Sequence, residues 1–145
     1  MIFSLLAAGS LAAMAAFDTR QYEAIHLYCA IGFFVFDALF ITLNTIGFEL
    51  HRRSEPTEKA WRRSTLAKCV LAALFWAAVI VYLPVGLAVV CAFEKNEVTR
   101  EYDYSNCSTE NVMRIVAQYA SVLFTMCYFA SFYFDLFRAS DVSRM

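Results

Sequence analysis

One long apolar run dominates this chain: residues 22–48 read YEAIHLYCAIGFFVFDALFITLNTIGF. The run is longer than the roughly 20 residues that an α-helix needs to cross about 30 Å of hydrocarbon. Three more apolar segments occupy residues 1–17, 66–93 and 112–137, and the first of them has the minimum length for a span. Because a helix satisfies its own backbone hydrogen bonds where water is absent, we expect all four segments to be transmembrane helices.

The composition excludes most soluble classes. The 145 residues are 61% hydrophobic and 17% charged, whereas soluble globular chains are about 45–50% apolar. A net charge of −1 gives no field that would attract nucleic acid, and the four glycines and two prolines exclude collagen-like chains. We therefore predict an all-α polytopic membrane protein: residues 1–145 form a single membrane domain, a four-transmembrane-helix bundle. The expected partners are membrane lipids and other transmembrane proteins, with no nucleic acid.

The connectors between the apolar segments differ in charge. Residues 49–65 hold five basic residues, and Lys68 follows just inside the next apolar segment. Loops rich in Lys and Arg lie on the cytoplasmic side of membranes. Residues 94–111 hold five acidic residues against two basic ones, and they contain the glycosylation sequon Asn106-Cys107-Ser108, which is used only on the translocated side. We therefore expect 49–65 to be a cytoplasmic loop. The loop 94–111 should be luminal or extracellular and glycosylated at Asn106.

Two of these features have a second interpretation. Residues 1–17 end in small residues and are either a span or a cleaved signal peptide, although no basic residue precedes the apolar stretch. Some basic side chains of the 49–65 connector either only set the topology or also contact anionic lipid headgroups. The candidates for headgroup contacts are Arg52, Arg53, Arg62 and Arg63.

Polar residues recur at membrane depth in two of the segments. An ionisable group at that depth is costly, so Asp37 prompts a functional hypothesis. At 100° per residue, the polar positions of 22–48 fall on one stripe, and those of 112–137 fall on another. We expect the two stripes to face each other or a shared cavity. This predicted intramembrane polar face consists of His26, Asp37, Asn44, Gln118, Ser121, Thr125, Tyr128 and Asp135.

Three roles for this polar face are open. Its residues can hydrogen-bond across the bundle, as polar side chains often do between membrane helices. Alternatively, they line a polar cavity for a lipid headgroup or make Asp37 proton-sensitive. A third role is contact with a partner helix that supplies the missing counter-charge.

Motifs of the common enzyme classes are missing from the sequence, which has no GxSxG, P-loop, GxGxxG or HExxH. The two histidines, His26 and His51, are expected on opposite sides of the membrane. We therefore expect a non-enzymatic protein with no catalytic residues, no cofactor and no metal site. Cys91 and Cys107 are expected on the luminal side, where an oxidising compartment would allow them to form a disulfide.

Two stretches of the chain resemble a known family. The first runs from AFDTRQY at 16–22 through His26 to CAIGFF at 29–34, and the second runs from AQY at 117–119 to SFYFD at 131–135. They resemble the DRAM, Frag and Sfk superfamily of six-pass membrane proteins. The resemblance covers the chain from about residue 12 to 136, which corresponds to the last four of the six family spans. Gln118 departs from the family pattern, since members often carry Glu there.

This resemblance implies three functions. DRAM-type members look like lysosomal or endosomal proteins that promote autophagy. Frag-type members are Golgi or ER proteins required for remodelling GPI-anchor lipids, and Sfk-type members are plasma-membrane proteins linked to phosphoinositides. The spacing of aromatic and polar residues in 112–137 is closest to the DRAM type. We therefore expect a non-catalytic modulator of autophagy and lysosomal function in lysosomal or endosomal membranes.

The orientation is testable through the sequon. If residues 94–111 face the lumen, Asn106 should carry an N-linked glycan, and Asn106→Gln should abolish the glycosidase-sensitive shift in gel mobility. A cytoplasmic position of this loop, shown by protease protection in sealed microsomes, would contradict the predicted topology.

Overall fold

The part of the chain that the structure describes folds mainly into four α-helices. The computed structural model describes residues 2–17, 21–54, 59–86, 91, 94–99 and 101–142, with side chains except those of 59–62, 86, 94–95 and 136–142. The helices are α1 (Ile2–Ala16), α2 (Glu23–Ser54), α3 (Lys59–Gly86) and α4 (Ser108–Val142). Two short strands, β1 (Glu94–Lys95) and β2 (Tyr102–Asp103), and the 3-10 turn η1 (Ser105–Cys107) precede α4.

Length and composition allow three of the helices to cross a membrane. These are α2, residues Arg63–Val85 of α3, and residues Ser105–Asp135, which comprise η1 and most of α4. The predicted all-α membrane fold is therefore confirmed. The expected first span, 1–17, forms a shorter apolar helix, since the 15 residues of α1 measure about 22 Å at 1.5 Å per residue.

Several helix boundaries differ from the expected ones, mostly because the helices continue beyond the apolar runs. The predicted loop 49–65 is mostly helical, since α2 continues past Phe48 to Ser54 and α3 begins at Lys59 instead of Leu66. Glu49 accepts from side chains three and four residues later, and such pairs support a helix. At its other end, α3 ends at Gly86, soon after Pro84. The predicted helix continues to residue 93, but residues 87–90, 92 and 93 lie outside the described residues. α4 extends beyond the predicted 112–137 at both ends.

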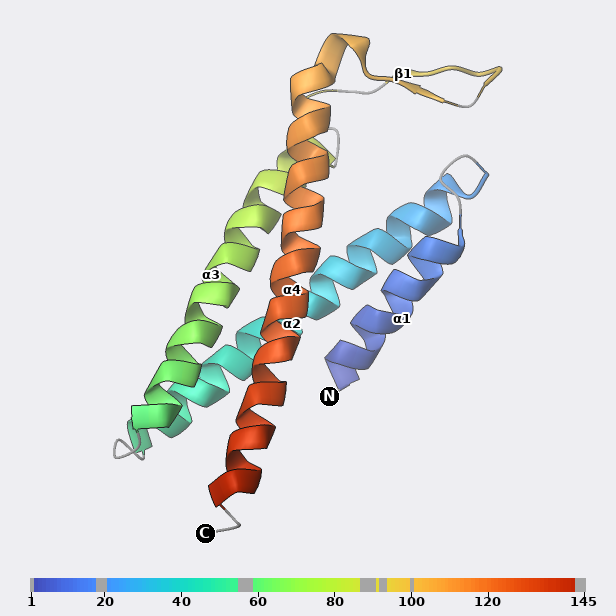
Figure 1. Ribbon diagram of the computed structural model, residues 1–145. Helices are drawn as coiled ribbons and strands as arrows, with labels where there is room; N and C mark the ends of the chain where they lie inside the picture. The colour runs from blue at the N-terminus through green and yellow to red at the C-terminus, as the bar shows by residue number, and fades with distance from the viewer. Residues whose placement is uncertain are drawn as a thin grey trace.

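The helices form two antiparallel pairs that cross. Figure 1 shows α1 running alongside α2, α3 running alongside α4, and α2 crossing the second pair at a steep angle. We call the end that carries β1 and β2 the hairpin end, and the end where α2 leads to α3 the basic end. α1 approaches α2 closely at Gly32, where an added Cβ would lie 3.0 Å from Ser10 Oγ. Small residues allow such close approach between membrane helices.

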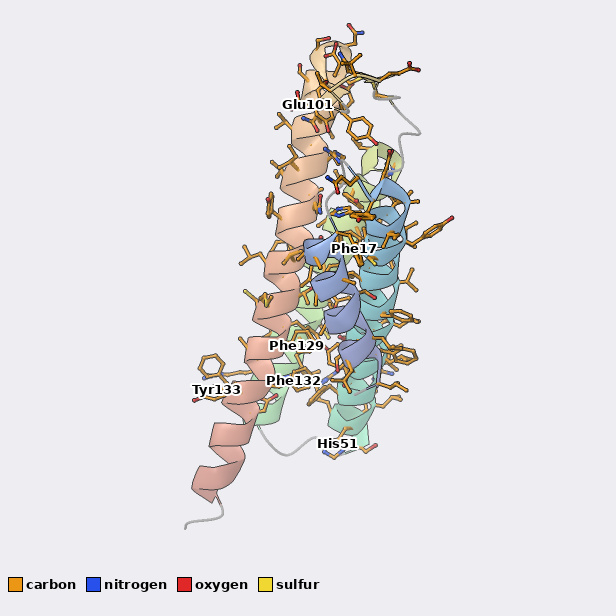
Figure 2. The ribbon with its side chains drawn as sticks, turned by 90° about the vertical axis from the view of Figure 1, so that its right-hand side faces the viewer. Phe17, His51, Glu101, Phe129, Phe132 and Tyr133 are labelled. Atoms are coloured by element: carbon orange, nitrogen blue, oxygen red, sulfur yellow. A yellow bond between two sulfur atoms is a disulfide. The ribbon has the colours of Figure 1, made fainter. Side chains whose placement is uncertain are left out.

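The core lies along the inner face of α2. Phe33, Phe34, Phe40 and Ile41 are buried there. They pack with buried residues of the other helices, namely Ala7, Ala72, Phe75, Val79 and Tyr128. Figure 2 shows Phe129 and Phe132 on the side of α4 that faces α2, and Tyr133 on the outer side. The Phe40 ring stacks on the Phe129 ring with their centroids 4.9 Å apart.

The hairpin end is cross-linked. A disulfide joins Cys91 to Cys107, with their Cα atoms 6.4 Å apart, and thereby ties the segment after α3 to the start of α4. β1 and β2 pair antiparallel, with Glu94 opposite Asp103. The Tyr102 hydroxyl donates a hydrogen bond to Glu23 at the start of α2. Desolvation and this bond raise the pKa of Tyr102 to about 12, so the hydroxyl keeps its proton.

Candidate functional site

Asp37 lies at the crossing of α2 and α4. Its side chain is fully buried, and its Oδ2 accepts a hydrogen bond from the Thr125 hydroxyl of α4. Ser121 O, 3.0 Å from the same hydroxyl, is a second acceptor. Asp37 Oδ1 is buried and has no hydrogen-bond partner among the described residues. A buried carboxyl with only one such contact is expensive, so the α2–α4 crossing depends on the bond from Thr125.

Tyr128 makes a second polar contact between the same helices. Its side chain is fully buried, and its hydroxyl lies 2.9 Å from Thr45 Oγ1 and donates to Ile41 O at 3.3 Å. Thr45 can therefore donate to the tyrosine oxygen while the tyrosine donates to the backbone. Its ring makes edge-to-face contacts with Phe40 and Phe132. Tyr128 thus fixes α4 to α2 nearer the basic end than Thr125 does.

An ion pair between the buried Lys68 and the partly exposed Asp135 joins α3 to α4 at the basic end. Lys68 is fully buried, and its ammonium donates to Asp135 Oδ2 and, at 2.8 Å, to Ser64 Oγ. Ser64 in turn donates to Asp135 Oδ1 at 2.6 Å. The Lys68 Nζ also lies 4.5 Å from the centroid of the Phe48 ring and 4.9 Å from that of Phe132. One lysine therefore contacts three helices, which is typical of a cation that is paired instead of solvated.

Sequence reasoning missed this ion pair. Lys68 had been counted only as a basic residue near the end of the 49–65 connector, so its charge was assigned to topology. A signal was nevertheless present, because Lys68 lies one turn after Ser64 and inside the apolar segment 66–93. An ionisable group at that depth requires a partner.

The predicted polar face divides into separate contacts. Asp37, Thr125 and Tyr128 come together at the α2–α4 crossing, whereas Asp135 binds α3. His26 Nδ1 lies 2.8 Å from Phe17 O and thereby joins α2 to the end of α1. Two of the remaining residues bond within their own helices: the Asn44 amide donates to Phe40 O at 2.8 Å, and Ser121 Oγ donates to Gln118 O at 2.8 Å.

The basic residues also separate into groups. Arg52 donates twice to Glu49, at 2.7 and 2.6 Å, and Arg53 donates to the same carboxylate at 3.0 Å. Arg63 is exposed at the start of α3, and the side chain of Arg62 lies outside the described residues. Two of the four candidate headgroup contacts are therefore engaged within α2.

The predicted glycosylation site lies at the hairpin end. Asn106 is exposed in η1, beside the disulfide of Cys107.

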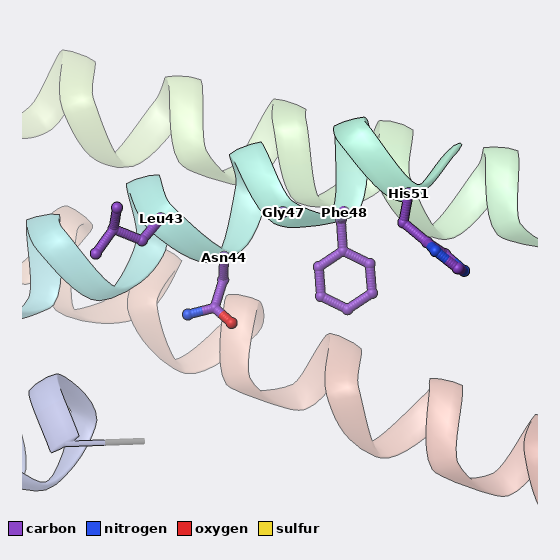
Figure 3. Close-up of a pocket in the computed structure, with 5 residues that line it drawn as sticks. All are labelled: Leu43, Asn44, Gly47, Phe48 and His51. Carbon is purple, nitrogen blue, oxygen red and sulfur yellow. The ribbon is translucent and has the colours of Figure 1, made fainter. Parts of the chain in front are cut away.

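An open groove of about 340 Å³ runs along α2 near the basic end. Figure 3 shows its lining residues on one stretch of that helix, with Asn44 and the Phe48 ring extending into the space between α2 and α4. The lining residues are Leu43, Asn44, Gly47, Phe48 and His51.

In the described part of the chain, no three His, Cys, Asp or Glu side chains are placed to hold a metal ion.

Comparison with known proteins gives one match. Residues 1–139 match the family model described as Frag1/DRAM/Sfk1/Cwh43P N-terminal domain. No curated protein and no solved structure matches the chain. The match covers all four helices up to Ala139, close to the end of α4.

The ion pair at the basic end predicts a specific pattern of stabilities. Asp135→Asn leaves the buried Lys68 charge without its counter-ion, and breaking a buried pair in this way costs about 3–5 kcal/mol. The free energy of unfolding in detergent should fall by that amount. Adding Lys68→Met removes the stranded charge and should recover most of the loss. Arg53→Gln, which removes an exposed contact with Glu49, is the matched control and should leave the unfolding curve unchanged. An Asp135→Asn protein as stable as the wild type would contradict this role of the ion pair.

Proposed function

Because the chain belongs to the Frag1/DRAM/Sfk1/Cwh43P N-terminal domain family, we propose that it is a non-catalytic modulator of autophagy in lysosomal or endosomal membranes. The family match confirms the resemblance seen in residues 16–34 and 117–135. It also agrees with an integral membrane protein, since three helices are long and apolar enough to span a bilayer. The choice of the DRAM type is supported by the spacing of aromatic and polar residues in α4.

The observation that best supports a non-catalytic role is the use of the two intramembrane carboxyl groups. Asp37 accepts from Thr125, and Asp135 pairs with Lys68. Both contacts join one helix to another, so these groups stabilise the arrangement of the bundle. A general acid or base would instead need access to a reacting group within hydrogen-bond distance. Of the roles open for the polar face, hydrogen bonding across the bundle is the one that this geometry favours.

The aromatic-Asp end of α4 supports the same interpretation. Residues 131–135, SFYFD, carry part of the family resemblance. Phe132 lies 4.9 Å from Lys68 Nζ, and Asp135 binds the same ammonium. This motif therefore has a structural task, which is to receive the buried lysine of α3.

The proposal is tested by location and by autophagic flux. A C-terminally tagged chain should reside in lysosomes or endosomes, and cells that lack the chain should degrade an autophagosome marker more slowly than wild-type cells. Asp37→Asn should restore this flux, since the amide oxygen still accepts from Thr125. Loss of flux from a normally folded and correctly located Asp37→Asn protein would contradict the structural role of Asp37.

Two other outcomes would favour the other family functions. Golgi or ER location with loss of surface GPI-anchored proteins on deletion would favour GPI-lipid remodelling. Plasma-membrane location that is lost when Arg52, Arg53, Arg62 and Arg63 are reversed in charge would favour a phosphoinositide-linked scaffold. Either outcome would overturn the autophagy proposal.

A further inference from the structure

The groove on α2 combines apolar and polar lining in a definite order. Leu43, Gly47 and Phe48 form its apolar part, and His51 lies one turn further toward the basic end. Asn44 donates its amide to Phe40 O, which leaves the side-chain oxygen as an acceptor within the lining. Figure 3 shows these residues following one another along the helix, with Asn44 and the Phe48 ring extending toward α4.

This order matches the depth profile of a bilayer leaflet. The apolar run of α2 ends at Phe48, and the last turn of the helix contains His51, Arg52 and Arg53. The apolar lining therefore lies at the depth of acyl chains, and His51 lies at the depth of the headgroups. Since no water is available at the depth of Leu43, an open groove there is filled by hydrocarbon.

The charge at this end indicates which lipid fits. Residues 49–65 carry five basic residues against three acidic ones, and Glu49 is already bound by Arg52 and Arg53. The local surplus is positive and attracts anionic headgroups. We propose that the groove binds an anionic phospholipid of the leaflet at the basic end, with one acyl chain along Leu43, Gly47 and Phe48 and its phosphate at His51. This site does not depend on the autophagy proposal.

Gly47 offers a way to close the groove without disturbing the helices. A Cβ added at Gly47 meets no atom within 4 Å, so a larger side chain would extend into the space assigned to the lipid. Gly9 of α1 is the matched control, because a Cβ added there also meets no atom within 4 Å and Gly9 is not part of the groove lining. Phe48 is unsuitable for this test, since its ring also contacts Lys68.

The test uses photo-cross-linking in vesicles. The full chain is reconstituted in phosphatidylcholine vesicles that contain a trace of phosphatidylserine with a photoreactive acyl chain, or of phosphatidylcholine with the same chain. Adducts should concentrate on residues 43–48 and should be more abundant with phosphatidylserine. Gly47→Leu should lower these adducts about tenfold, equivalent to about 1.4 kcal/mol of binding free energy. Gly9→Leu should leave them unchanged.

Several results would contradict the proposal. Equal labelling of wild type and Gly47→Leu, or adducts spread evenly over α2, α3 and α4, would show that lipid does not occupy the groove. Equal labelling by the two lipids would contradict the anionic headgroup. His51→Ala gives an independent check at an exposed residue. It should remove the preference for phosphatidylserine and leave labelling by phosphatidylcholine unchanged, and a retained preference would exclude His51 as the phosphate contact.

Discussion

The hydrogen bond from Thr125 to Asp37 is the contact on which the arrangement of this bundle depends. In lipid, apolar helix faces gain little by leaving hydrocarbon for one another, so packing and interhelical hydrogen bonds decide how helices associate. A fully buried carboxyl adds a strong constraint, because it is stable only where a donor meets it. α2 must therefore cross α4 where Thr125 lies. The Thr45–Tyr128 contact supports the same crossing. A further hydrogen bond joins α3 to α2, since the Trp76 indole donates to Thr42 Oγ1 at 3.1 Å.

The two ends of the bundle are stabilised differently. At the hairpin end, a disulfide joins Cys91 to Cys107, and the hydrogen bond from Tyr102 joins β2 to Glu23 at the start of α2. At the basic end, the ion pair of Lys68 joins α3 to α4, and the groove stays open beside it. Phe48 links these last two features, since it lines the groove and contacts the lysine. A lipid in the groove would therefore lie next to the ion pair.

Sequence alone predicts the helical membrane fold, because the length of apolar runs is set by the bilayer. Periodicity also places Asp37, Thr125 and Tyr128 on inward faces, and in the structure Asp37 bonds to Thr125 while Tyr128 bonds to Thr45 of α2. The partner of Asp135 was not foreseen, since it depends on how α3 packs against α4 and Lys68 had been assigned to topology. The predicted helix ends at 48 and 66 were wrong, because α2 and α3 continue into polar residues that are also compatible with a helix. The groove depends on the open space at Gly47, which no sequence pattern reveals.

A double-mutant cycle on Asp37 and Thr125 tests the central contact most directly. Asp37→Leu, Thr125→Val and the double variant would be compared with wild type by their free energies of unfolding in detergent. If Thr125 donates to Asp37 across the α2–α4 crossing, the two losses are not additive, with a coupling free energy of about 0.6–1.7 kcal/mol as for interhelical hydrogen bonds in membranes. Additive losses would show that the two side chains act independently and would contradict the crossing described for α2 and α4.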